Sequence, residues 1–216
     1  MKIGLMGGTF NPIHLAHLRI AEEARDLCGL DRVSFIPAAD LPHKPLSGNI
    51  SFEQRCRMVR LAIADNPAFQ FSDIEGERAG KSYSIDTIEI FTARHPDDEL
   101  FFIIGGDSYL EFGTWHRYAD FFNRCSLIVI ERPGCRITDP LSALPVAIRG
   151  EFSYTAAAQR LVHCSGRSIQ ILRGRPLDIS STEIRRMVAA GRSITYLVPP
   201  DVETYIKKQR IYTECP

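Results

Sequence analysis

The sequence predicts an α/β fold: a doubly wound, mainly parallel sheet with helices on both faces. Apolar runs of strand length alternate with stretches of helical periodicity along the 216 residues. The run at residues 100–104 is apolar throughout, which is typical of a strand covered on both faces. The length and the 44% hydrophobic content suit one compact domain over residues 1–216, and we expect a small helical segment after about residue 180.

The first elements follow from apolar spacing. Residues 2–6 form an apolar run that predicts a strand. Apolar residues then recur at helical spacing from Leu15 to Leu27, and Gly29 is expected to end this helix. A second strand is predicted over residues 32–37.

The next helix is predicted from its cap. Ser51 and Gln54 form a capping-box pattern ahead of a helical apolar repeat, which predicts a helix over residues 51–65 after a Pro-rich loop at 38–49. No structure is assigned between Pro133 and Gly166. The remaining predicted elements are a helix at 84–94 and strands at 100–104, 127–130 and 169–172.

Charge and hydropathy exclude several partners. Lys plus Arg and Asp plus Glu number 26 each, so the chain has no strong field for nucleic acid or an anionic membrane. The N-terminal apolar run is too short for a signal peptide, and no run approaches the ~20 residues of a membrane span. Because the six cysteines show no CxxC pair or metal-ligand spacing, we expect a cytoplasmic protein with reduced thiols and no metal site of its own.

The loop after the first strand suits a phosphate. Gly7, Gly8, Thr9 and Phe10 follow the strand directly, and the two glycines permit a positive φ and close approach to a ligand. Ligands of open α/β sheets bind at the carboxyl ends of strands. The loop has neither the GxGxxG spacing of a dinucleotide site nor the GKS or GKT ending of a P-loop.

Two histidines follow this loop. Asn11 and Pro12 are suitable N-cap and N1 residues, so the helix is expected to start there or within one turn. His14 and His17 are then i, i+3 neighbours beside a helix N-terminus, where imidazoles can donate to phosphate oxygens. A structural or solvated pair is the alternative. Zinc fits less well, because zinc helices use the i, i+4 spacing of HExxH.

A second candidate phosphate site lies near the C-terminus. Residues 179–185, ISSTEIR, open a helix, and Ser180 with Glu183 has capping-box spacing. Arg185, one turn into the helix, can bind phosphate oxygens with its forked guanidinium. The alternative is a simple helix cap followed by a solvated face.

Together, residues 7–17 and 179–185 resemble the two signatures of the HxGH nucleotidyltransferase superfamily, although Ala16 stands where most members have glycine. The resemblance implies a Rossmann-like fold and catalytic roles for His14, His17 and Arg185. It also implies an ATP site that includes Gly7, Gly8, Thr9, Phe10, Ile179, Ser181 and Thr182.

Further segments resemble the branch that adenylylates nicotinate mononucleotide. The resemblance implies that Gly105 and Asp107 hold the ATP ribose and that Lys44, in a Pro-His-Lys loop, approaches the phosphates. It assigns Ser84, Trp115 and His116 to the pyridine nucleotide, with the tryptophan stacked on the ring. From the residues alone, Asp107 could cap a helix and Trp115 could belong to the core.

The resemblance therefore predicts transfer of AMP from ATP to nicotinate mononucleotide, with Mg²⁺ arriving on the ATP. Alternatives within the class are nicotinamide mononucleotide, dual specificity, or phosphopantetheine as acceptor. A non-catalytic nucleotide-binding regulator is the alternative from another class. The oligomeric state stays open, a homo-oligomer included.

Overall fold

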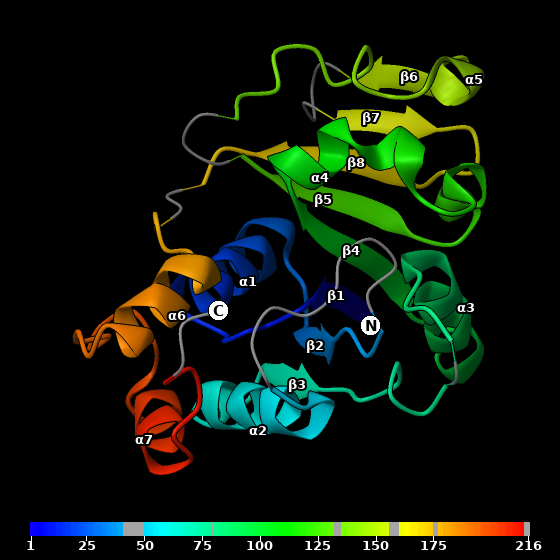
Figure 1. Cartoon of the computed structure of the whole chain (residues 1–216). Coiled ribbons are helices and arrows are strands. Elements are labelled where there is room, and N and C mark those ends of the chain that lie inside the picture. The colour runs from blue at the N-terminus through cyan, green and yellow to red at the C-terminus, as the bar shows by residue number, and fades with distance from the viewer. Residues whose placement is uncertain (41–49, 79, 132–134, 156–159, 175–176, 214–216) are drawn as a thin grey trace. The chain divides into compact units, whose positions relative to one another are not determined.

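A computed structural model describes residues 1–40, 50–78, 80–131, 135–155, 160–174 and 177–213 (Figure 1). They divide into two compact units, which are treated separately below. Unit 1 contains Met1–Met6, Ala21–Val33 and Tyr83–Pro176, and unit 2 contains Gly7–Ile20, Ser34–Ser82 and Leu177–Pro216. The organisation as one domain stays a prediction.

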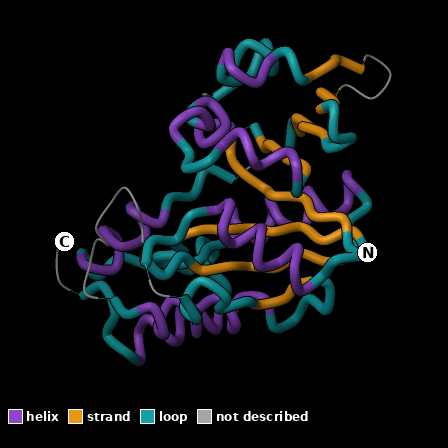
Figure 2. The backbone as a smooth tube through the Cα atoms, turned by 90° about the vertical axis from the view of Figure 1, so that its right-hand side faces the viewer, coloured by secondary structure: helices purple, strands orange, loops and turns teal. Residues whose placement is uncertain are grey.

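The strands and helices alternate as expected, and Figure 2 shows strands with helices alongside them. The strands are β1 (Lys2–Gly8), β2 (Arg32–Pro37), β3 (Phe69–Phe71), β4 (Glu99–Gly105), β5 (Ser126–Ile130), β6 (Phe152–Thr155), β7 (Arg160–His163) and β8 (Ser168–Leu172). The α-helices are α1 (Leu15–Cys28), α2 (Phe52–Ile63), α3 (Ser84–Arg94), α4 (Gly106–Leu110), α5 (Val146–Arg149), α6 (Ser181–Ala189) and α7 (Pro200–Lys208). Two 3₁₀-helices are η1 (Phe112–Thr114) and η2 (Tyr118–Asn123).

The hydrogen-bonded strand order is β3-β2-β1-β4-β5-β8-β7-β6. The pairs β1–β4, β4–β5 and β5–β8 are parallel, and β6–β7 and β7–β8 are antiparallel. β1 and β2 also run in the same direction, because the Asp31 N–H donates to the Lys2 carbonyl at one end and the Ala38 N–H to the Gly8 carbonyl at the other. The prediction of a mainly parallel sheet is confirmed.

The doubly wound arrangement follows from this order. The chain moves from β1 to β2 in one direction along the sheet and from β4 to β5 in the other. Because crossovers between parallel strands are right-handed, α1 and the α4–η2 segment lie on opposite faces. β1 and β4, from which two predicted nucleotide motifs emerge, are the pair at which the order reverses.

Local sequence signals place most element ends. The helix predicted from Ser51 is α2: the Ser51 hydroxyl accepts from the Gln54 N–H, and the Gln54 side chain accepts from the Ser51 N–H. Gly29 ends α1 with a φ of 61°, in the left-handed region that favours glycine. The predicted strands and the 84–94 helix appear within two residues of their expected ends.

The core of unit 1 gathers around the central strands. All five residues of β5 and the five inner residues of β4 are buried, as expected for strands covered on both faces. Beside them lies an aromatic cluster with edge-on and tilted ring contacts, 4.9–6.3 Å between centroids. Its members are Phe102, Phe112, Trp115, Tyr118, Phe121, Phe122 and Phe152.

The segment left unassigned contains α5, β6 and β7. β6 and β7 form an antiparallel hairpin that pairs with β8. Their four-residue strands lie below the length at which alternation is readable in the sequence.

No described helix is long and apolar enough to cross a membrane. Five of the six cysteines are described, and all five are free thiols.

Gly4 supplies a test of packing in unit 1. A Cβ there would lie 2.9 Å from Leu30 Cδ1, 3.0 Å from Ile103 Cδ1 and 3.2 Å from Val33 Cγ2. We expect Gly4→Val to lower the free energy of unfolding by about 1–3 kcal/mol through overpacking, measured by urea denaturation. Gly150→Ala is the matched control, since its Cβ would meet nothing within 4 Å; equal stability of the two variants would contradict this packing.

Candidate active site

The loop between β1 and α1 is held by its carbonyl groups. In unit 2, Arg55 Nη1 donates to the Thr9 carbonyl at 2.8 Å. Arg185 Nη1 donates to the Asn11 carbonyl at 2.8 Å, and Ser181 Oγ donates to the Pro12 carbonyl at 2.9 Å. Ser181 and Arg185 come from α6, about 170 residues away, so the two predicted phosphate motifs are in direct contact.

This pattern fixes the direction of the loop amides. In a trans peptide, the carbonyl and the following N–H point in opposite directions. The N–H groups of Phe10 and Ile13 therefore point away from Arg55 and Ser181, respectively. Backbone N–H groups turned outward from a loop at a strand end are suited to an anion.

The conformation of the loop differs from the prediction in one respect. The positive φ expected at Gly7 or Gly8 occurs at Phe10, at 46°. A Cβ at Gly8 would lie 3.1–3.4 Å from the Phe10 ring, a tight contact that a small shift of the ring would have to relieve. Phe10 is buried, and its ring packs edge-on against the His17 imidazole with centroids 5.1 Å apart.

The two histidines lie at the start of α1. The helix begins at Leu15, within one turn of Pro12, and Asn11 is not its N-cap as predicted. Instead the His14 carbonyl accepts from the His17 N–H at 3.0 Å, which puts His14 in the N-cap position. The two imidazoles stack with centroids 3.7 Å apart, so the predicted i, i+3 pairing is confirmed.

The contact between them assigns a tautomer to His17. The His14 backbone N–H donates to His17 Nδ1 at 3.2 Å, so Nδ1 carries the lone pair and Nε2 carries the hydrogen in the neutral ring. The arrangement matches the second half of a capping box, with a histidine in place of the usual glutamate. His17 is thereby preset as a hydrogen-bond donor.

The N-terminus of α6 lacks the capping box predicted for it. The Ser180 side chain makes no cap hydrogen bond. The next residue, Ser181, uses its hydroxyl on the Pro12 carbonyl, and Thr182 Oγ1 accepts a long bond of 3.4 Å from Arg185 Nη2. The Ser181 and Thr182 hydroxyls thus serve the Pro12 carbonyl, 169 positions away, and Arg185 of the same helix, and neither caps α6 through Ser180.

Tyr212 completes the support of the loop. Its hydroxyl donates to Asn11 Oδ1 at 2.6 Å, and both residues are buried. Burial raises the pKa of Tyr212, so the phenol stays protonated and remains a donor. No local pattern indicates this residue, because it lies 201 positions from its partner.

Unit 2 places two buried guanidiniums at the loop. Arg55 is 0% exposed and Arg185 is 8% exposed. Among the described residues, neither has an ion pair within 4.0 Å, although the buried Glu75 is near enough to favour the charged form of Arg55. Burial lowers the pKa of Arg55. Since buried cations normally have a close charged partner, two guanidiniums without one beside a single loop are suited to an anionic ligand.

A groove follows the exposed side of α6. It has a volume of about 500 Å³ and includes the guanidinium-bearing residues Arg186 and Arg192. Its lining is completed by Ser180, Thr182, Glu183, Met187 and Ala190. The groove therefore begins at the helix N-terminus that contacts the loop. Ile179 immediately precedes it, half-buried, with its N–H bonded to the Leu177 carbonyl.

Unit 1 carries the remaining predicted nucleotide residues. Gly105 ends β4 and is the N-cap residue of α4, and Asp107 is exposed in the first turn of that helix. Gly105 has no side chain that could cap the helix, and it occupies the N-cap position. Asp107 is therefore not the N-cap residue of α4, and its carboxylate is exposed in the first turn.

The predicted pyridine residues lie near one another in unit 1. Ser84 is the first residue of α3, and the preceding Tyr83 ring lies 4.3 Å from the His116 ring. Trp115 is half-buried: its indole packs edge-on against Phe102 and tilted against Phe112. Trp115 thus belongs to the aromatic core and keeps part of its surface exposed, so the two interpretations of this residue are compatible.

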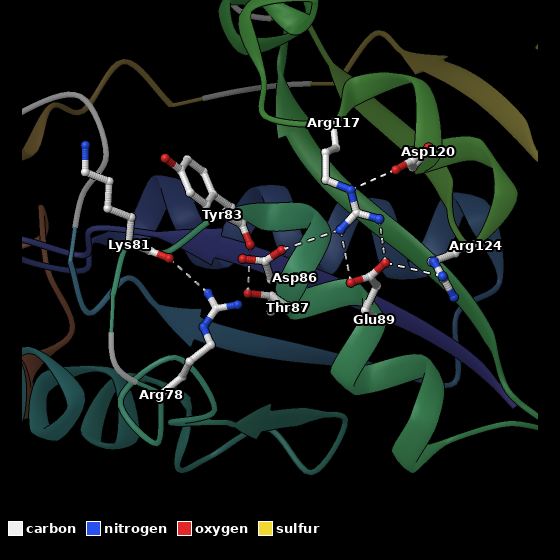
Figure 3. A network of polar contacts seen from close by, with 9 residues as sticks. All are labelled: Arg78, Lys81, Tyr83, Asp86, Thr87, Glu89, Arg117, Asp120 and Arg124. Atoms are coloured by element: carbon white, nitrogen blue, oxygen red, sulfur yellow. Dashed lines mark hydrogen bonds and ion pairs between the residues drawn. The ribbon is translucent and has the colours of Figure 1, made fainter.

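Arg117, which the sequence did not single out, connects this segment to α3 (Figure 3). Its guanidinium donates to Glu89 Oε1 at 2.9 Å and to Asp120 Oδ2 at 2.8 Å, and it lies 3.9 Å from Asp86 Oδ1. The hydrogen bond from Arg117 lowers the pKa of Glu89 and raises the pKa of Arg117. The network thereby holds the segment that follows Trp115 and His116 against the helix that begins at Ser84.

Lys44 lies outside the described residues, so its role stays a prediction. The expectation that the protein has no metal site of its own also stays a prediction. Among the described residues, one group could ligate a metal ion: Glu151, His163 and Cys164, whose ligand atoms lie within 4.8 Å of one another. Its histidine already contacts Glu151 Oε2 at 2.7 Å and Ser165 Oγ at 2.8 Å. The sequence did not indicate this group, because β6 and β7, which bring Glu151 next to His163 and Cys164, were not predicted.

The Arg117 network should make stability depend on pH. Because the pKa of Glu89 is lowered in the folded state, its stabilising effect is complete above the ordinary glutamate pKa of about 4.3 and is lost as the pH falls through the folded value. We expect Glu89→Gln to cost about 1 kcal/mol or less at neutral pH and to converge with the wild type below about pH 4. Thermal melts of the wild type and of Glu89→Gln across this pH range would measure the difference in stability. Glu111→Gln is the control, because Glu111 is exposed and joins no such network among the described residues, so this variant should show no convergence.

Comparisons with known proteins show the family of the chain. Residues 5–187 match the family described as cytidylyltransferase-like. A relative from Pelobacter propionicus, named "Probable nicotinate-nucleotide adenylyltransferase", is 68% identical over 216 residues and covers 100% of both chains. One of the same name from Geobacter sulfurreducens is 58% identical over 212 residues and covers 98% of each.

Solved structures support the fold. The chain is similar to a Plasmodium falciparum nicotinic acid mononucleotide adenylyltransferase complexed with NaAD, with a TM-score of 0.76 and 19% identity over 99% of this chain and 98% of that one. At that identity, the likeness shows the fold alone, whereas the closely related full-length sequences show the family. The chain therefore belongs to the nicotinate-nucleotide adenylyltransferases, within the cytidylyltransferase-like family.

Proposed function

We propose that the chain transfers AMP from ATP to nicotinate mononucleotide, giving nicotinate adenine dinucleotide and pyrophosphate, as a step of NAD biosynthesis. The observation that carries the proposal is the 9–12 loop, which α6 contacts through Arg185 and α2 through Arg55, two buried arginines without an ion pair among the described residues. A polyphosphate supplies the missing negative charge. The names of the full-length relatives support the choice of acceptor.

The chemistry needs no protein nucleophile. An oxygen of the mononucleotide phosphate attacks the α-phosphorus of ATP and forms a new P–O bond, while the bond from the α-phosphorus to the bridging oxygen of pyrophosphate breaks. The attacking phosphate is already anionic, so the protein contributes alignment and stabilisation of the developing charge.

The ATP end of the site is assigned to unit 2. His17 would donate its Nε2 hydrogen to a phosphate oxygen, since Nδ1 accepts from the backbone. His14 and Arg185 would stabilise the charge on the transferred and leaving groups, joined by Lys44. The nucleotide would also contact Gly7, Gly8, Thr9, Phe10, Ile179, Ser181 and Thr182, while the ribose is assigned to Gly105 and Asp107 of unit 1.

The acceptor end is assigned to the segment around Trp115. The pyridine ring would stack on the exposed part of the indole. The nicotinate carboxylate would meet the backbone N–H groups at the start of α3, where the Ser84 helix has no side-chain cap. His116, whose ring lies against Tyr83, would border this position.

Mg²⁺ fits this site as a companion of ATP. The groups that surround the 9–12 loop among the described residues are hydroxyls, backbone groups and guanidiniums, which suit phosphate oxygens better than a bare cation. The triphosphate oxygens would therefore hold the ion. When bound, it offsets charge on the departing pyrophosphate. We place the reaction in the cytoplasm, where ATP is available.

The acceptor can be tested directly. With MgATP at a fixed concentration, we expect nicotinate mononucleotide to be used with a kcat/KM at least about tenfold above that of nicotinamide mononucleotide, because only the acid offers a carboxylate to the α3 N-terminus. Equal use of both would indicate dual specificity, and turnover of phosphopantetheine alone would contradict the proposal. Absence of pyrophosphate release with every acceptor would favour a nucleotide-binding regulator.

His17 provides a second test. His17→Ala should lower kcat by roughly 10²- to 10³-fold through loss of a donor to the transition state. The fold should persist, as judged by circular dichroism. His95→Ala is the control: this histidine is paired with Asp98 at the end of α3, and its loss should leave turnover within about twofold of wild type. Wild-type turnover in His17→Ala would remove the histidine from the mechanism.

A further inference from the structure

Arg55 is a fully buried residue that no part of the predicted site includes. It lies on α2, it is 0% exposed, and it is among the largest fully buried side chains of the described residues. Its guanidinium carbon lies 5.4 Å from the centroid of the Phe52 ring. Tyr212 and Glu75 are near enough to influence its charge, and both favour the charged form.

The hydrogen bonding of Arg55 is incomplete for a structural role. The Arg55 side chain makes one hydrogen bond among the described residues, from Nη1 to the Thr9 carbonyl. Its Nε and Nη2 groups are buried and have no hydrogen-bond partner among these residues. A guanidinium has five N–H donors, and unsatisfied buried donors are costly. Placing such a cation in the interior destabilises the fold relative to an apolar residue of similar size.

A neighbouring arginine shows the usual arrangement. Arg60, on the same helix, has a side chain 46% exposed, pairs with Asp73 at 3.2 Å and lies 3.8 Å over the Phe71 ring. Both arginines thus contact a phenylalanine, but only Arg60 has a carboxylate partner and solvent. The difference indicates that the buried charge of Arg55 has a role other than stabilising the fold.

The one acceptor of Arg55 identifies this role. Thr9 lies in the loop whose next carbonyls are held by Arg185 and Ser181. We propose that Arg55 is a positioning residue for the ATP triphosphate: it holds the Thr9 carbonyl inward, so the Phe10 N–H faces outward toward a phosphate, and it adds a permanent positive charge behind the loop. The inference rests on the proposed function, because the triphosphate is the anion it serves.

The test compares Arg55→Met, which removes the charge and keeps the volume, with Arg60→Met on the same helix. Melting temperature is measured without nucleotide and with MgATP, and kcat and KM are measured for ATP and for the acceptor. We expect Arg55→Met to keep a nucleotide-free melting temperature close to wild type, to lose most of the rise caused by MgATP, and to raise the KM for ATP by about tenfold or more. The KM for the acceptor should change by less than about threefold, and Arg60→Met should match wild type in all nucleotide-dependent values.

A purely structural Arg55 gives the opposite result: a fall in the nucleotide-free melting temperature with an unchanged KM for ATP. That outcome overturns the inference. Should Arg55→Met not fold, Arg55→Gln decides the question, because it also removes the charge but keeps a polar side chain; an ATP KM within twofold of wild type in a folded Arg55→Gln also overturns the inference. If the wild-type chain binds ATP but adenylylates no acceptor, the proposed function fails, while the melting temperatures with MgATP still test Arg55.

Discussion

The hydrogen bonds from Arg185 and Ser181 to the carbonyls of Asn11 and Pro12 are the constraint on which the candidate site depends. They join a loop at the start of the chain to a helix near its end. Without them, the loop carbonyls would have no donors from α6 and could turn outward, where a phosphate would be repelled. Because Ser181 holds the Pro12 carbonyl inward, the Ile13 N–H faces outward, where it can donate to an anion. Arg185 holds the Asn11 carbonyl, and the following Pro12 has no N–H to turn outward.

The same region shows a trade between stability and function. Two buried guanidiniums without carboxylate partners among the described residues raise the energy of the nucleotide-free protein. In the proposed function, a polyphosphate would offset this cost when it binds, so the charge would contribute to affinity. The chain as a whole has equal numbers of acidic and basic residues, which means that this attraction is local and does not depend on the net charge of the molecule.

Comparison of prediction with structure shows which signals are local. The α/β class, the parallel strands and the Ser51 capping box were all predicted correctly, because they depend on apolar spacing and on side chains three residues apart. The Ser180 capping box was wrong, because the Ser180 side chain makes no cap hydrogen bond and the adjacent Ser181 hydroxyl bonds to Pro12, 169 positions away. Arg55, Arg117 and Tyr212 were missed for the same reason: their partners lie 46, 28 and 201 positions away. Motif resemblance predicted the contact of the two signatures, but no local pattern indicates what supports them from behind.

The antiparallel hairpin β6–β7 continues the sheet beyond its last parallel strand, β8. Every parallel strand added to a sheet requires a long crossover, whereas a hairpin needs only a short turn. The outermost strand is then four residues long, which limits the length of unpaired backbone available to another chain. This border of the molecule can therefore gain or lose residues during evolution while the ladder of β1, β4 and β5, and the loops that leave it, stay in register.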